Sequence, residues 1–142
     1  MHTLAVRFLD QGFHRVLFDA MPMPVFVVDQ DVSILEYNAA AAGLLGGDRK
    51  AVLLKRGGAA LNCVHSTEMP GGCGHATVCG DCVVRNAVGS AFQGKAVTRK
   101  AADMELRSSR GKRTKVRLRV STQPVRYDDQ KFVLLILEGL ND

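Results

Sequence analysis

The sequence predicts an α+β domain: a five-stranded antiparallel sheet with helices packed on one face and one further helix flanking it at the N-terminus. Two short β-rich runs lie in the first third of the chain, and three longer ones close it. The stretch between them contains helical periodicity and turn residues. Strand runs on either side of a helical insert are typical of antiparallel sheets whose helices are segregated to one side.

Size and composition indicate one globular domain. The chain has 142 residues, of which 46% are hydrophobic and 23% charged, enough for one core. No apolar run approaches the roughly 20 residues that cross a membrane. Arg7 and Asp10 interrupt the apolar N-terminus, unlike a secretory signal. A cytoplasmic location is therefore expected, where thiols stay reduced and clustered cysteines bind metal or sense redox state.

The N-terminal third is expected to form a helix followed by a β-hairpin. Apolar side chains between Leu4 and Met21 have helical spacing. Pro22 and Pro24 end that helix because neither can donate a backbone hydrogen bond. The β-rich runs 25–28 and 32–37 are separated by a short polar turn, which is typical of a hairpin.

Helices are expected to follow the hairpin. Asn38 can cap a helix over 39–45, because its side-chain oxygen can accept an N–H of the first turn. Another short helix is expected over 48–55. After a long stretch without periodicity, Asp81 is expected to cap a helix that ends at Gly94.

The C-terminal third is expected to form three strands joined by turns, over 96–106, 112–120 and 131–137. Ten basic and two acidic residues lie between Lys95 and Arg119. Lys115, Arg117 and Arg119 alternate with apolar residues, so these cations form the solvated face of a strand. No aromatic side chains are interleaved with them for base stacking, and no nucleic-acid partner is expected.

Two segments carry a resemblance to a known family. Residues Phe18 to Asp29 resemble the opening strand of PAS domains, and Ile34 to Ala40 resemble their second strand and the asparagine that starts the next helix. The resemblance covers nearly all of 15–140. It implies a PAS-like sheet over 22–142, with an N-terminal flanking helix over 1–21 and a cysteine-rich loop over 57–82.

The PAS resemblance also implies a function class. PAS domains are sensory input modules of bacterial signal transduction, often followed by a histidine kinase, and many form homodimers through the N-terminal helix. The sequence contains no G-x-S-x-G, Walker or H-E-x-x-H motif, so no enzymatic activity is expected.

All cysteines of the chain lie within twenty residues. Cys63, Cys73, Cys79 and Cys82 have the spacing C-x9-C-x5-C-x2-C. Two thiolates separated by two residues can bind one metal centre, because a tight turn brings both sulfurs to one side. Four sulfur ligands suit zinc or an iron–sulfur cluster. The sequence therefore predicts a four-cysteine metal or cluster site, which would also order a long loop that has no hydrophobic core.

The identity of the cofactor stays open between zinc and iron–sulfur, with iron–sulfur slightly favoured. Some bacterial PAS sensors hold clusters on four cysteines, which implies redox or oxygen sensing. Structural zinc in a protein-interaction or ligand-binding module is the alternative. His65 or His75 could replace one sulfur but are more typical of loop histidines. A dithiol switch at Cys79 and Cys82 is a further alternative.

Flavin and haem are not expected. Asn62-Cys63 matches only two residues of the flavin-reactive motif of light-sensing PAS relatives. The haem attachment motif C-x-x-C-H is absent, since Val83 follows Cys82.

Overall fold

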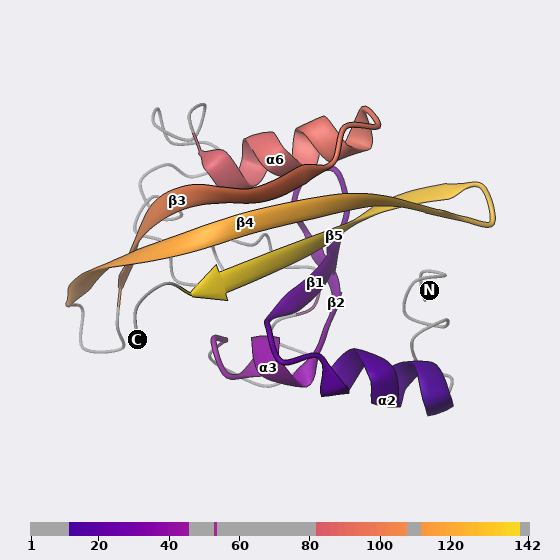
Figure 1. The fold of residues 1–142 in the computed structure, drawn as a ribbon, viewed down its shortest axis with the longest axis horizontal. Helices are drawn as coiled ribbons and strands as arrows, with labels where there is room; N and C mark the ends of the chain where they lie inside the picture. Colours follow the sequence, from indigo (N-terminus) through magenta and orange to yellow (C-terminus); the bar gives the residue numbers. More distant parts are fainter. Residues whose placement is uncertain (1–11, 46–52, 54–81, 108–111, 140–142) are drawn as a thin grey trace.

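The five strands of the described chain form one antiparallel sheet. The computed structural model describes residues 12–45, 53, 82–107 and 112–139. In chain order the elements are α2 (Gly12–Ala20), β1 (Val25–Val28), β2 (Ile34–Tyr37), α3 (Ala39–Ala42), α6 (Val83–Phe92), β3 (Val97–Arg107), β4 (Arg113–Tyr127) and β5 (Gln130–Gly139). The strand order is β2-β1-β5-β4-β3 (Figure 1). The predicted fold class is thereby confirmed.

One face of the sheet holds the main core under α6 (Figure 1). Alternate residues of β4 and β5 point to this face, because successive side chains of a strand point to opposite sides. They meet the buried side of α6, formed by Val84, Ala87, Val88 and Ala91. The buried Thr122 hydroxyl donates to the Ala87 carbonyl oxygen at 3.0 Å, which satisfies the polar group inside this core.

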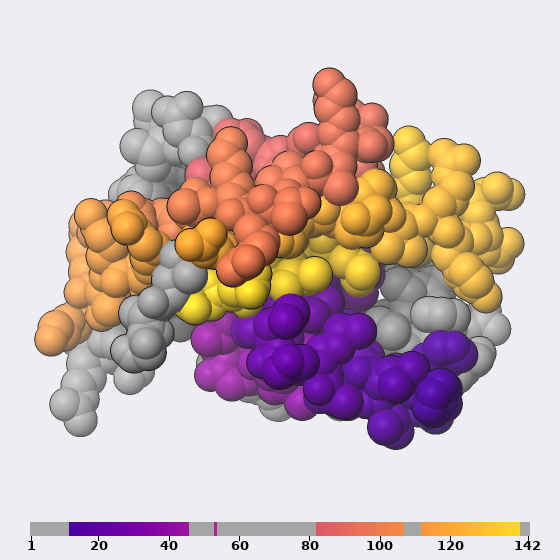
Figure 2. Space-filling view, viewed as in Figure 1, coloured from indigo at the N-terminus to yellow at the C-terminus, as the bar shows by residue number. Residues whose placement is uncertain are grey.

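The opposite face of the sheet is partly covered by the N-terminal helix α2. Phe18 is the buried residue of α2, and it packs in a second cluster with Val25, Val27, Leu35 and Phe132. In the space-filling view (Figure 2) α2, in dark indigo, lies at the lower right of the molecule. The sheet therefore has helices on both faces: α6 on one, and the flanking helix α2 on the other.

The strand boundaries differ from the predicted ones where turns or polar residues intervene. β2 begins at Ile34 because the Asp29 side chain accepts hydrogen bonds from the N–H groups of Asp31 and Ser33, both at 2.9 Å, and holds the turn. β4 continues to Tyr127, since it pairs with β5 as far as Gln130. The polar stretch after Val120 breaks the apolar alternation, so the predicted strand ended too early.

The helix starts were predicted with mixed success. Asn38 is the N-cap of α3 as expected, and its side chain accepts from Ala41 N. The predicted cap Asp81 was wrong: Cys82 is the N-cap of α6 and makes no side-chain cap hydrogen bond. The helix expected over 48–55 lies outside the described residues except for Leu53, as does the part of the first helix before Gly12. No helix of the described residues is long and apolar enough to span a membrane.

Candidate functional site

Cys82 is the one predicted ligand that the structure describes. Its side chain is half-buried, forms no disulfide and packs against the main core cluster. The remaining predicted ligands, Cys63, Cys73, Cys79, His65 and His75, lie outside the described residues. Among the described ranges, no group of three or more His, Cys, Asp or Glu side chains could hold a metal ion. The four-cysteine site therefore stays a prediction, with one of its members placed.

The start of α6, next to Cys82, is joined to the turn between β1 and β2. Arg85 Nη1 lies 3.1 Å from Asp31 Oδ1, and Arg85 Nη2 donates to the Asp31 carbonyl oxygen at 3.2 Å. The Arg85 side chain is mostly covered, with 19% of it exposed. A shift of the first turn of α6 would therefore act on this hairpin as well as on the core below the helix.

A buried asparagine joins α2, β1 and α3. Asn38 is 1% exposed, and its Oδ1 accepts from Val25 N and Ala41 N, both at 3.0 Å. Its Nδ2 donates to the carbonyl oxygens of Phe18, at 3.1 Å, and Met23, at 3.0 Å. One side chain thus satisfies backbone groups at the end of α2, the start of β1 and the first turn of α3.

An ion pair holds α2 on the sheet beside Asn38. Arg15 Nη1 lies 3.2 Å from Oε2 of Glu36, a β2 residue that is 0% exposed. The contact is ionic, since Arg15 Nη1 has no aligned hydrogen-bond acceptor among the described residues. Arg15 Nε also donates to Asp19 Oδ2 at 3.2 Å, and Asp19 Oδ1 accepts from Ala39 N at 2.9 Å. The sequence analysis missed this pair, although a carboxylate inside the apolar run 34–37 was a signal for it.

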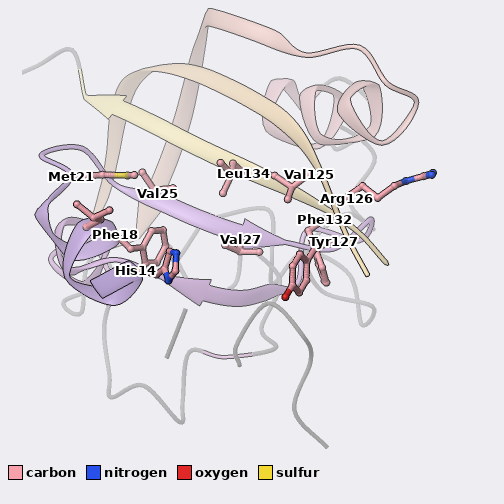
Figure 3. A pocket seen from close by; sticks show the side chains of 11 residues that line it. His14, Phe18, Met21, Val25, Val27, Val125, Arg126, Tyr127, Phe132 and Leu134 are labelled. Atoms are coloured by element: carbon pink, nitrogen blue, oxygen red, sulfur yellow. The ribbon is translucent and has the colours of Figure 1, made fainter. Parts of the chain in front are cut away.

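A hollow of about 350 Å³ lies between α2 and the outer face of the sheet (Figure 3). Its walls are apolar side chains of α2, β1, β4 and β5, among them Leu17, Phe18, Val27 and Phe132. His14 and Tyr127 also line it. Figure 3 shows the Arg126 side chain pointing away from the other lining residues. Amphipathic spacing had predicted α2, but nothing in the sequence indicated a cavity beneath it.

The geometry agrees with comparisons to known proteins. Residues 12–70 match the family model described as PAS domain. The PAS domain of nitrogen regulation protein NR(II) from Vibrio parahaemolyticus superposes with a TM-score of 0.64 and 14% identity, covering 92% of this chain and 100% of that one. The PAS domain of BvgS from Bordetella pertussis gives 0.56 and 17%, covering 97% and 87%. A PAS domain from a two-component sensor histidine kinase gives 0.58 and 12%, covering 97% and 100%.

No curated protein matches the sequence of this chain. The strand order, the two-sided packing and the family match over 12–70 together define the class. The sheet has the fold of PAS domains, and residues 12–70 match that family, as the resemblance had implied.

Proposed function

We propose that this PAS domain is the sensory input module of a bacterial signal-transduction protein, without catalytic activity of its own. It senses redox state or oxygen in the cytoplasm through a metal or iron–sulfur site on Cys63, Cys73, Cys79 and Cys82. Several structures with this fold are PAS domains of proteins named as sensors, such as a two-component sensor histidine kinase. This supports a downstream signalling domain, such as a histidine kinase, as the partner.

The observation that carries the proposal is the position of Cys82. It is the last residue before α6 and packs against the main core cluster. A change in its bonding would act on the first turn of α6, where Arg85 contacts Asp31 at 3.1 Å. Because α6 packs on β3, β4 and β5, the effect would reach most of the sheet. A sensor needs such a differential effect on two conformations.

Cys82, the one predicted ligand that the structure describes, is suited to a metal centre. The Cys82 thiol is in no disulfide and caps no backbone group, so it is available as a ligand. Sulfur ligands suit zinc and iron–sulfur clusters alike, and a cluster would supply reversible one-electron chemistry. A zinc ion with all four coordination positions filled by cysteines would instead be a structural site that only holds the loop. We favour the cluster because sensing requires a change of state at the site.

Changing Cys82 to Ser is expected to lower the metal retained after anaerobic purification by about tenfold or more. Mutating residues that only hydrogen-bond to metal ligands typically lowers metal affinity about 10–100-fold, and Cys82→Ser removes a ligand itself. Helix α6 should persist, because serine is a favoured N-cap. The measurement is iron, zinc and acid-labile sulfide per chain. Gln93→Ser at the exposed C-cap of the same helix is the matched control and should retain full metal.

The outcomes separate the alternatives. Iron with sulfide in the parent chain, lost in Cys82→Ser, supports the redox sensor. Zinc without sulfide would support a structural zinc site in a protein-interaction or ligand-binding module. No metal in the parent chain would leave the Cys79–Cys82 thiol–disulfide switch. Full metal content in Cys82→Ser would contradict the assignment of Cys82 as a ligand.

We also propose that the domain acts as a homodimer. The support is an exposed apolar surface on α2 and just after it, where Phe13, Val16, Leu17 and Met21 are all among the exposed large hydrophobic residues. Exposed apolar patches on this scale mark interaction sites. A dimer formed through the N-terminal helix would let a change in one copy alter the arrangement of both.

A further inference from the structure

We propose that the hollow under α2 is a binding site for a small, uncharged aromatic molecule of about two fused rings. The hollow lies between α2 and the outer face of the sheet (Figure 3), whereas α6 and the main core lie on the other face. Such a site is separate from the proposed function, because no cysteine is among the described residues that line the hollow.

The hollow is concave, with a buried base and an exposed rim. The base includes Phe18, Val27 and Phe132, which are buried members of the second core cluster. The rim includes Leu17 and Tyr127, which are 48% and 47% exposed. A helix is about 10 Å across, so a partner helix would rest on the rim and reach the base only with the ends of its side chains. A small molecule can contact base and rim together, as ligands in concave sites do.

The volume of the hollow sets the size of the ligand. It is about 350 Å³, which lies within the range of about 300–1,000 Å³ that is typical of small-molecule sites. A cavity of about 150 Å³ holds one benzene molecule. A molecule of about two fused rings would therefore fill the hollow, whereas a single ring would leave about half of it empty.

The walls of the hollow favour an aromatic ligand. The chain contains only six Phe, two Tyr and no Trp, yet Phe18, Phe132 and Tyr127 all line this hollow. His14 adds a further ring, and Met21 adds a thioether. Aromatic rings attract one another in edge-to-face and offset arrangements, and thioether sulfur makes favourable contacts with ring edges. The hollow is therefore better matched to a flat ring system than to a saturated chain.

The same walls disfavour a charge on the ligand. No acidic side chain is among the described lining residues, so a bound cation would have no counterion. Arg126 lines the hollow, but Figure 3 shows its side chain pointing away from the other lining residues. A bound anion would therefore have no partner at the apolar base either. Because an unpaired charge is costly to move from water into an apolar site, the ligand is expected to be uncharged.

A ligand in the hollow would also hold α2 on the sheet. Phe18, the buried residue of α2, forms part of the base. Its carbonyl oxygen accepts from Asn38 Nδ2 at 3.1 Å, and the guanidinium carbon of Arg15 lies 5.7 Å from the centre of its ring. The ligand would add apolar contacts to the residue that Asn38 and Arg15 position. A ligand that binds one placement of α2 better shifts the population toward it, which would give the domain a second input besides the cysteines.

Isothermal titration calorimetry of the full chain with naphthalene tests the site. The dissociation constant is expected to be about 10–100 μM, as is reasonable for a ligand of this size. The matched ligand is the naphthalene dicarboxylate that carries a carboxylate at each end of the ring system. It should bind about tenfold more weakly or worse, because one of its charges would lie in the apolar hollow.

Val27→Phe places a ring in the hollow and is expected to raise the dissociation constant for naphthalene about tenfold or more. Its Tm without ligand should stay the same or rise, because the added ring fills empty space. Val16→Phe is the matched control, since Val16 is exposed on α2 and is not among the described lining residues. Its dissociation constant for naphthalene should stay unchanged. If Val27→Phe folds poorly by circular dichroism, Val125→Phe, at another lining position, replaces it.

Three results would overturn the inference. They are a dissociation constant above about 1 mM for the parent chain, equal binding of naphthalene and its dicarboxylate, and an equal effect of the two phenylalanine variants. Sedimentation equilibrium on the same samples tests the other occupant. If naphthalene binds only to a monomer and dissociates a dimer, a second copy occupies the hollow and the inference is wrong. Metal and sulfide content keeps the cysteine site separate: a chain that binds metal but no naphthalene would lose this site and keep the proposed sensor.

Discussion

Changing Asn38 to Ala is expected to lower the free energy of unfolding by about 3–4 kcal/mol. The substitution removes an N-cap, which costs about 0.5–2 kcal/mol. It also removes the side-chain partners of Val25 N and the Met23 carbonyl oxygen, both 3.0 Å from the Asn38 amide atoms, at about 1–3 kcal/mol for each unsatisfied group. The Phe18 carbonyl oxygen loses its bond to Asn38 as well but still accepts from Met21 N at 3.4 Å. A domain has only about 5–15 kcal/mol of stability, so the effect is large.

Urea unfolding followed by circular dichroism measures this change. Asn38→Asp keeps the side-chain oxygen that accepts from Val25 N and Ala41 N but loses the two hydrogen bonds that the amide donates. Its free energy of unfolding should therefore fall less than that of Asn38→Ala. Gln123→Ala, at an exposed position within β4, is the control for the loss of a side-chain amide and should change stability by under about 0.5 kcal/mol. A loss of less than about 1 kcal/mol for Asn38→Ala would contradict the role of Asn38 in joining the three elements.

Changing Arg15 to Met is expected to lower the free energy of unfolding by about 2–4 kcal/mol. Removing one partner of a fully buried pair costs about 3–5 kcal/mol, because the remaining charge loses its counterion. Glu36 keeps the hydrogen bond that its Oε1 accepts from Tyr37 N at 3.1 Å. Here Glu36 is fully buried but the Arg15 side chain is 28% exposed, so a somewhat smaller value is expected. The apolar stem of Met preserves part of the contact that Arg15 makes over the Phe18 ring.

Arg117→Met provides the matched control for the loss of an arginine. Arg117 pairs with Asp103 at 3.1 Å, but its side chain is 68% exposed. Exposed pairs contribute about 0–1 kcal/mol, so this variant should unfold close to the parent chain. The double variant Arg15→Met with Glu36→Leu should recover most of the lost stability, since the buried charge is gone. Equal losses for Arg15→Met and Arg117→Met would refute the importance of burial at Glu36.

These two positions also bear on the proposed homodimer. Asn38 and Arg15 both hold α2, the helix that carries the proposed contact with a second copy. Asn38 also starts α3, which precedes the segment that contains Cys63, Cys73 and Cys79. Variants that loosen α2 are expected to weaken the dimer in the same order as they lower stability, which sedimentation of the Asn38 and Arg15 variants would measure.

Much of the fold could be predicted from local sequence. Pro22 and Pro24 end α2, because proline cannot continue a helix, and Asn38 caps α3, because its side chain is next to the N–H groups that it satisfies. The alternation in β4 placed Leu118 and Val120 in the core. The spacing of the four cysteines also predicts a metal or cluster site, which no described contact tests. These conclusions depend on residues that lie within a few positions of one another, so the pattern itself contains the physical cause.

Tertiary structure alone decided which distant groups meet. Glu36 is separated by 21 residues from Arg15, and only the packing of α2 against β2 makes the carboxylate buried and paired. The hollow likewise depends on α2, β1, β4 and β5 together, and Cys82, the N-cap of α6, packs against the core. By itself the sequence determined most of the described helices and strands, because propensity and periodicity are local, while the cysteine ligands stay a prediction. Burial, charge pairing and cavity shape depend on residues that are far apart in the sequence and that only the folded chain brings together.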